Sequence, residues 1–275
     1  MKNIFVVRRF FFTLVLTGFL NGCATEASTS DAKERLATAR AMFAKRCETA
    51  GEKIYRKADD VEGIFILKLR PNDLNSGDQF ALDDPYGSDY SGNGYIETFI
   101  RGSYQATVTG GKKDELRPRL GYLYADAVDP KNGLRYRYTG RIEEPWQKDK
   151  SYLKGYHRFV LDKILVSDNL PRYGVTYDDI STRQEREYWI AGSSLKVIDL
   201  KTNEIIAERI GYMMDKRQGS LEGFRSPWLF AAENACPGFS NGTSTPSGRP
   251  AYDAQARQTQ DFVEKVLHPA INRKK

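Results

Sequence analysis

Residues Tyr122–Ile142 read YLYADAVDPKNGLRYRYTGRI, the clearest local structural pattern in the chain. Apolar and aromatic residues are frequent in its two arms, Tyr122–Val128 and Leu134–Ile142, as is typical of β-strands. The five residues between the arms, Asp129–Gly133, contain a proline and an Asn-Gly pair, and both favour a tight turn. The sequence therefore predicts a β-hairpin at this position.

Six further segments have strand patterns, and two of them predict a second hairpin. Tyr188–Leu200 and Ile205–Met214 flank a short polar connection, Lys201–Glu204. The other candidate strands are Gly63–Leu69, Tyr95–Arg101, Phe159–Val166 and Tyr173–Ile180. Strands therefore dominate the middle of the chain.

Helical patterns lie near both ends of the chain. Asp31 and Glu34 form an Asp-x-x-Glu cap, which predicts a helix beginning at Asp31. The apolar residues that follow at helical spacing are Leu36, Ala39, Phe43 and Cys47. Near the other end, Asp253–Leu267 is amphipathic and is followed by Pro269, which stops a helix. We therefore expect a single α+β domain over residues 31–275, mainly an antiparallel β-sheet with an N-terminal and a C-terminal helix.

The first 23 residues have the pattern of an export signal. Three basic residues precede Phe10–Leu20, an apolar run of 11 residues that is too short to span a bilayer. The run ends in Leu20-Asn21-Gly22-Cys23, and here the chain resembles a bacterial lipoprotein precursor. That resemblance implies a signal peptide over residues 1–22 and lipidation of Cys23. The small and polar residues after the cysteine predict a flexible tether over residues 23–30. Ala24 resembles a signal for sorting to the periplasmic face of the outer membrane.

Charge and composition exclude several classes of function. The chain of 275 residues has 42 Lys and Arg against 36 Asp and Glu, and residues 1–22 carry three basic and no acidic residues. The processed chain would therefore have 39 basic and 36 acidic residues, a net charge of +3. This small excess, in an envelope protein, argues against nucleic-acid binding. Aromatic residues make up 12% of the chain, which argues against wholesale disorder.

The two remaining cysteines, Cys47 and Cys236, form an even pair in an oxidising compartment. We expect them to form a disulfide. The alternative is two separately buried thiols.

Motifs for catalysis and metal binding are incomplete. Ser151–Lys154, Ser167–Asn169 and Lys201–Asn203 follow the order of the penicillin-recognising serine enzymes, but the third lacks its glycine and the spacing is too short. Residues 89–96 resemble half a calcium loop, yet Ile100 stands where a bidentate glutamate is needed. The only histidines, His157 and His268, lie far apart. We therefore expect no enzyme activity, no cofactor and no metal.

Three arginines alternate with other residues in the second arm of the first hairpin. A period of two places Arg135, Arg137 and Arg141 on one face of a strand. This pattern is either a solvated face or a patch for anionic headgroups or an acidic partner.

The segment Pro71–Gly94 is the strongest candidate for a partner-binding site. Its 24 residues have little periodicity, and connections of this length are often functional. The residues that we expect to contact a partner are Asp83, Asp84, Tyr86, Asp89 and Tyr90. Aromatic side chains beside carboxylates suit a protein interface, although a surface loop without function has the same composition.

Four features together resemble the lipoprotein immunity proteins that are paired with phospholipase effectors of type VI secretion. They are Leu20–Cys23, the stretch from Cys47 to Arg70, the Asp83–Gly87 run DDPYG and the Cys236–Phe239 run CPGF. The resemblance implies a tethered inhibitor that binds a secreted phospholipase in the periplasm. An envelope assembly or scaffold lipoprotein is the alternative, and an enzyme acting on cell wall or lipid ranks last.

Overall fold

The computed structural model describes residues 21–70, 90–104, 121–143, 158–239 and 250–270. The helices are α1 (Asn21–Cys47), α2 (Gly92–Tyr104), α3 (Arg183–Glu187), α4 (Pro227–Ala231), α5 (Pro250–Ala256) and α6 (Gln258–Val266). The strands of the main sheet are β1 (Gly51–Ile54), β3 (Gly63–Ile66), β4 (Tyr124–Val128), β5 (Arg135–Glu143), β6 (Arg158–Leu165), β7 (Tyr173–Asp179), β8 (Ile190–Asp199), β9 (Glu204–Met214) and β10 (Ala235–Cys236). A second small sheet pairs β2 (Ala58–Val61) with β11 (Leu267–Pro269).

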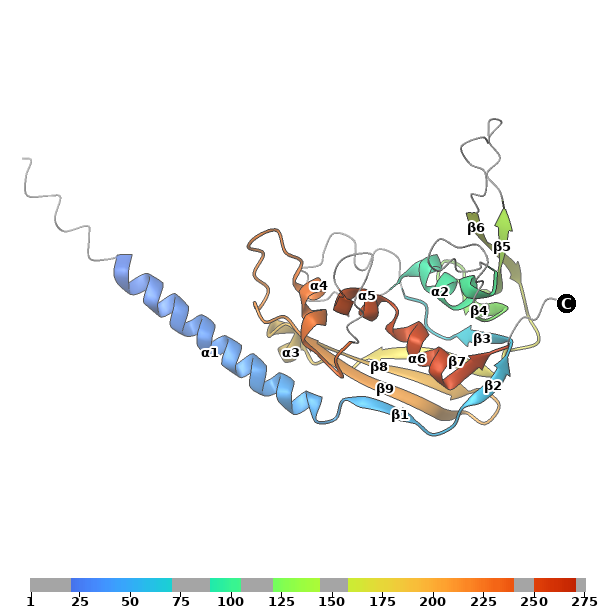
Figure 1. Ribbon diagram of the computed structural model, residues 1–275, viewed down its shortest axis with the longest axis horizontal. Helices are drawn as coiled ribbons and strands as arrows, with labels where there is room; N and C mark the ends of the chain where they lie inside the picture. The colour runs from blue at the N-terminus through green and yellow to red at the C-terminus, as the bar shows by residue number, and fades with distance from the viewer. Residues whose placement is uncertain (1–20, 71–89, 105–120, 144–157, 240–249, 271–275) are drawn as a thin grey trace, which may run out of the picture.

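The main sheet is mixed but mainly antiparallel. Its strand order is β1-β9-β8-β7-β3-β4-β5-β6, with β10 also paired to β9. Only β3 runs parallel to its neighbours, β4 and β7. Helices α2, α4, α5 and α6 lie over one face of the sheet (Figure 1). The α+β class expected from the sequence is therefore confirmed, with more helices than the two expected at the chain ends.

Both predicted hairpins are confirmed. β4 pairs with β5 through a turn in which the Gly133 and Lys131 amides donate to the Asp129 carbonyl and carboxylate, at 2.9 and 3.0 Å. Gly133 has a φ of 69°, which glycine adopts at little cost. β8 pairs with β9 around a turn in which Asn203 has a φ of 59°, a conformation that asparagine tolerates better than most residues.

The strand predicted over Tyr95–Arg101 is wrong, because this segment lies inside helix α2. The buried residues of α2 are Gly92, Tyr95, Ile96, Phe99, Ile100 and Ser103. They repeat at intervals of three and four, which is the spacing of a helix face rather than of a strand. Aromatic and β-branched composition had favoured a strand, and burial of the helical face overrides that preference.

Both terminal helices have different bounds from those predicted. α1 begins at Asn21, so residues 23–30, expected as a tether, are helical and Asp31 is no cap. That stretch contains neither glycine nor proline, so nothing in it breaks a helix. The predicted helix Asp253–Leu267 is divided into α5 and α6 at Arg257. Leu267 already belongs to β11 and has extended backbone, with a φ of −111° and a ψ of 94°.

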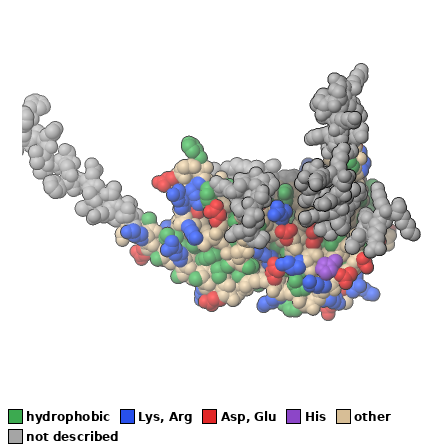
Figure 2. Space-filling view, viewed as in Figure 1, with side chains coloured by type: hydrophobic (Ala, Val, Ile, Leu, Met, Phe, Trp, Pro, Cys, Tyr) green, Lys and Arg blue, Asp and Glu red, His purple; other side chains and the backbone are tan. Residues whose placement is uncertain are grey.

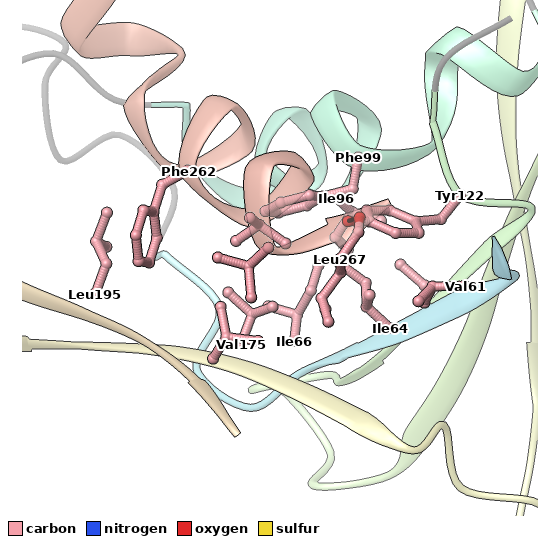
Figure 3. Packing of buried hydrophobic residues seen from close by; sticks show 14 of the residues in the cluster. Val61, Ile64, Ile66, Ile96, Phe99, Tyr122, Val175, Leu195, Phe262 and Leu267 are labelled. Atoms are coloured by element: carbon pink, nitrogen blue, oxygen red, sulfur yellow. Dashed lines mark hydrogen bonds between the residues drawn. The ribbon is translucent and has the colours of Figure 1, made fainter. Parts of the chain in front are cut away.

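The main core lies between the sheet and two helices. Ile96 and Phe99 of α2 and Phe262 of α6 pack on Ile64, Ile66, Val175 and Leu195 of the central strands (Figure 3). The Tyr122 hydroxyl donates to the Leu267 carbonyl at 2.7 Å, which joins the approach to β4 with the end of α6.

Helix α1 is attached to the opposite face of the sheet by its C-terminal half. Ala39, Met42 and Phe43 pack on Ile190, Tyr212 and Met214. Arg46 pairs with Glu185, which also caps α3 through Thr182. Burial raises the pKa of Glu185, but the hydrogen bonds from Arg46 and Thr182 outweigh it, so this pKa lies below its ordinary value. The other half of α1 projects beyond the sheet (Figure 1).

The predicted disulfide between Cys47 and Cys236 is confirmed. It joins the last residue of α1 to β10, across a sequence separation of 189 residues, with a Cα–Cα distance of 5.5 Å. The two cysteines meet because α1 packs on β9 and β10 pairs with β9 through Cys236 and Tyr212. The bond therefore fastens α1 to the sheet.

We expect Asp199 to make stability depend on acidic pH. Its fully buried carboxylate pairs with Arg172 at 2.9 Å and with Arg56 at 2.6 Å. The hydrogen bond from Arg172 is the largest cause that holds the pKa of Asp199 below its ordinary value. Because an unfolded Asp titrates near pH 3.9, the stabilisation is complete above about pH 4 and is lost as the pH falls through the lower, folded-state pKa.

Asp199→Asn should lower the urea midpoint at pH 7 and reduce the further loss of stability between about pH 4 and pH 2. Asp178→Asn is the control, because Asp178 pairs with Lys196 at 2.8 Å but is half exposed. Parallel midpoint-against-pH curves for Asp199→Asn and the unchanged protein would contradict this role.

Candidate partner-binding site

Arg70 and Gly92, which lie on either side of residues 71–91, meet beyond the end of β3. The Gly92 amide donates to the Arg70 carbonyl at 2.8 Å. Arg70 follows β3, and Gly92 is the first residue of α2, which leads on to the parallel strand β4. Arg70 and Gly92 are therefore neighbours on the helix-covered face of the sheet, although 21 residues separate them in sequence.

The Arg70 side chain makes this junction rigid. Its guanidinium is buried and lies 4.2 Å from the centroid of the Tyr177 ring and 5.8 Å from that of Tyr95. Lys68 lies 4.4 Å from the same Tyr177 ring and donates to the Tyr177 carbonyl at 3.2 Å. A cation over an aromatic ring contributes up to about 2 kcal/mol where water is excluded. Two cations therefore stack on Tyr177 beneath the junction, and we call Lys68, Arg70, Tyr95 and Tyr177 the loop base.

Helix α2 holds the loop base in place from the other side. Tyr95 and Phe99 form an edge-to-face pair with centroids 5.5 Å apart. The next described residues after α2 approach it closely, since a Cβ on Gly121 would lie 3.0 Å from the Ser103 amide nitrogen. Gly121 also has a φ of 135°, so a larger residue there would strain the backbone and push α2 outward.

One predicted contact residue lies at this junction. Tyr90 is 44% exposed, two residues before the start of α2, and its ring lies beside Gly94. Asp83, Asp84, Tyr86 and Asp89 lie outside the described residues. The residues of the loop base were not predicted as part of a site, because Arg70 and Tyr177 are distant in sequence and meet only when β3 pairs with β7.

The arginine face is present but its charges are paired. Asp126 is fully buried and accepts from Arg137 at 2.7 Å and pairs with Arg135 at 3.4 Å. The hydrogen bond to Asp126 is the largest cause that raises the pKa of Arg137, whose guanidinium also lies 4.0 Å from the Tyr124 ring centroid. Arg141 pairs with Asp162 at 2.9 Å. These ion pairs account for the alternation without an anionic ligand.

The remaining sequence motifs do not assemble a site in the described residues. Asn93 and Gly94 lie inside α2, so the half calcium loop has no loop geometry there. His268 pairs with Asp59 at 2.6 Å. Within the described ranges, no group of three or more His, Cys, Asp or Glu side chains could hold a metal ion. Of the described helices, none is long and apolar enough to cross a membrane.

Cys23, the proposed lipidation site, lies in the first turn of α1. The anchor position and the loop base are therefore parts of one connected structure, because α1 is fastened to the sheet by packing and by the disulfide. Comparison with protein families, curated proteins and solved structures found no match to this chain.

Proposed function

We propose that this protein is a periplasmic lipoprotein, tethered to the outer membrane through Cys23, that binds and neutralises an envelope-targeting toxin. The toxin that fits best is a secreted phospholipase effector. The observation that carries the proposal is the junction at which the Gly92 amide meets the Arg70 carbonyl, above the stack of the buried Arg70 and the exposed Lys68 on the Tyr177 ring.

A fixed junction favours binding for an entropic reason. Ordering a loop on binding costs free energy, and a loop whose ends are already held has less freedom to lose. Tyrosine supplies a large contact area with few rotatable bonds, which makes it a common anchor residue at interfaces. The carboxylates of Asp83, Asp84 and Asp89 would steer the segment towards a basic partner surface.

The anchor supports a protective role because it sets where binding occurs. A phospholipase must reach the bilayer to act, and an inhibitor held at the bilayer meets it there at high effective concentration. Two acyl chains on Cys23 would make this attachment stable.

The test is capture followed by inhibition. The full chain, purified from an oxidising envelope, is used to capture partners from the secreted and envelope fractions of its native cells. A stoichiometric phospholipase whose hydrolysis of phospholipid stops on binding supports the proposal. Capture of structural envelope components alone, or a phospholipase that stays active in the complex, overturns it.

Tyr90→Ala should weaken binding of the captured phospholipase by about 2 kcal/mol, roughly 30-fold. The reason is that Tyr90 is the described anchor residue at the junction. Asp83→Lys with Asp84→Lys should lower the association rate most strongly at low salt. Tyr55→Ala is the matched control, since Tyr55 is 67% exposed in the connection between β1 and β2. Calorimetric titration measures the affinities of the tyrosine variants, and stopped-flow mixing at several salt concentrations measures the association rate of the lysine variant. Equal losses of affinity for Tyr90→Ala and Tyr55→Ala would remove the segment from the interface.

A scaffold lipoprotein is the second candidate, and the edge of the main sheet favours it. β6 is the last strand of the sheet, and no strand of the described chain pairs with its outer edge. Ile164 and Leu165 on this strand are both largely exposed. Edges of this kind can add a strand from another protein. Envelope structural proteins recovered on β6 by crosslinking would favour the scaffold.

A further inference from the structure

The loop between β9 and α4 displays an exposed aromatic side chain. This loop, residues 215–226, rises as a knob on the helix-covered side of the sheet (Figure 1). Phe224 is fully exposed, and Leu221 is more than half exposed. We call residues 215–226 the Phe224 loop.

Asp215 braces the Phe224 loop from within. Its buried carboxylate accepts from the Arg225 guanidinium, from the Gly219 amide at 2.8 Å and from the Arg217 amide at 3.1 Å. Three points along the loop are therefore tied to one carboxylate, which fixes the path of the chain around it.

The base of the loop packs on a tryptophan pair. The rings of Trp189 and Trp228 lie 4.9 Å apart and are buried. A Cβ on Gly219 would lie 2.2 Å from Nε1 of Trp189, so the loop backbone sits directly on this ring. The Gln218 amide group donates to the Tyr188 carbonyl at 2.9 Å. These contacts place the loop on a rigid base.

The backbone at the tip adopts an unfavourable conformation. Phe224 has a φ of 57°, in the left-handed region that bulky residues rarely adopt. Such conformations cost free energy and persist where the surrounding structure enforces them, often at functional sites. Phe224 is also the most exposed large apolar side chain of the described structure. Backbone strain and exposure of apolar surface to water therefore occur at the same position.

The charges around the tip indicate what it meets. Lys216 and Arg217 are exposed on the same loop, as is the acidic Glu222. Figure 2 shows hydrophobic side chains at the outer end of the knob, with Lys and Arg side chains gathered below them and Asp or Glu at the side. If such a tip enters a bilayer, its apolar side chains reach the hydrocarbon, and the basic side chains behind them lie at the level of the anionic phosphates.

The position of the loop relative to the anchor helix supports the same conclusion. Arg35 of α1 stacks on the Tyr188 ring at 4.9 Å and donates to the Glu187 carbonyl, while Gln218 of the loop binds the Tyr188 carbonyl. The anchor helix and the Phe224 loop are thus fastened to the same short segment of the chain. A lipid on Cys23 would hold this end of the molecule near the membrane.

We infer that the Phe224 loop is a second membrane contact, in which Phe224 and Leu221 enter the interfacial layer and Lys216 and Arg217 bind anionic headgroups. A protein surface could also accept Phe224, but the two exposed basic residues Lys216 and Arg217 on the same loop and the shared attachment with α1 favour lipid. This inference rests on the anchor at Cys23 and not on any toxin, so failure of the capture test leaves it standing.

The experiment places a fluorescent reporter at the tip. The full chain carrying Phe224→Trp is purified from the envelope and reconstituted in vesicles of phosphatidylethanolamine and phosphatidylglycerol with brominated acyl chains. Its emission is compared with that of the unchanged protein, which already contains three tryptophans. We expect the introduced tryptophan to emit at shorter wavelength than a tryptophan in water. Its emission should be severalfold weaker in brominated vesicles than in vesicles without bromine. Lys216→Glu with Arg217→Glu should reduce both effects.

Leu170→Trp is the matched control. Leu170 is largely exposed in the connection between β6 and β7. This connection lies at the other end of the sheet, where the Leu200 amide, just after β8, donates to the Arg172 carbonyl. The control should emit as in water and show no quenching. Water-like emission from Phe224→Trp in every vesicle overturns the inference. A blue shift that occurs only when a protein partner is added also overturns it, and assigns the loop to that partner.

Discussion

Arg225→Met should lower the free energy of unfolding by about 3–5 kcal/mol, the cost of leaving a buried carboxylate without its partner. Asp215 and Arg225 form a salt bridge in which the side chains are 1% and 7% exposed. Removing the guanidinium leaves Asp215 with hydrogen bonds from the amides of Gly219 and Arg217, and these do not neutralise its charge. The loss should be read from urea unfolding followed by circular dichroism.

Two comparisons separate the buried charge from a general effect of losing an arginine. Arg101→Met removes an exposed pair with Glu97 at 2.6 Å and should cost less than about 1 kcal/mol. Asp215→Asn combined with Arg225→Met removes both charges and should recover part of the loss, because the buried carboxylate is gone. If the double variant is less stable than Arg225→Met by the full cost of a second lesion, the penalty does not come from the unpaired charge.

The same variant links the stability of the Phe224 loop to its proposed contact. Without Arg225 the loop loses one of the three ties to Asp215, and Phe224 becomes freer to leave its strained conformation. Arg225→Met should therefore weaken the vesicle signal of Phe224→Trp even at a temperature where the protein stays folded. A signal that is unchanged would show that the loop needs no bracing to reach lipid.

Local patterns predicted much of the fold. The hairpins around Asp129–Gly133 and Lys201–Glu204 were predictable because, within about 25 residues of chain, a short run of turn residues lies between two strand patterns. Helix α2 was missed because aromatic and β-branched composition was weighed above its three-and-four spacing. The parallel pairing of β3 with β4 and β7 has no local pattern, since it depends on which elements cover each other's apolar faces.

The candidate site was less predictable than the fold. Composition pointed to the segment Pro71–Gly94, but the loop base is formed by side chains from the residues after β3, from α2 and from β7, which meet only in three dimensions. Phe224 was not singled out, since one phenylalanine in the run GSLEGFRS is equally compatible with a buried position. The arginines of β5 showed the opposite: the period of two placed them correctly, but the sequence did not identify Asp126 as their partner.

Removing the disulfide should also have a large effect on stability, and the packing of α1 decides whether that effect is global or local to this helix. Cys47→Ala with Cys236→Ala should lower the free energy of unfolding by about 2–5 kcal/mol, because the bond closes a long loop and restricts the unfolded chain. The two cysteines are 189 residues apart in sequence, so the loop that the bond closes in the unfolded chain is long. Urea unfolding of the oxidised protein, the reduced protein and the double variant measures the effect, and the last two should agree.

The loss could instead be confined to the attachment of α1, and the contacts of that helix allow the two cases to be separated. Ala39, Met42 and Phe43 stay packed on the sheet and Arg46 stays paired with Glu185 when the bond is removed. Hydrogen exchange should therefore remain slow in the half of α1 that contains these residues if the bond acts on the unfolded chain. Fast exchange there, with unchanged global stability, would show that the bond serves only to hold the helix. Since Cys23 lies on the same helix, that result would make the disulfide the fastening between the proposed membrane anchor and the rest of the protein.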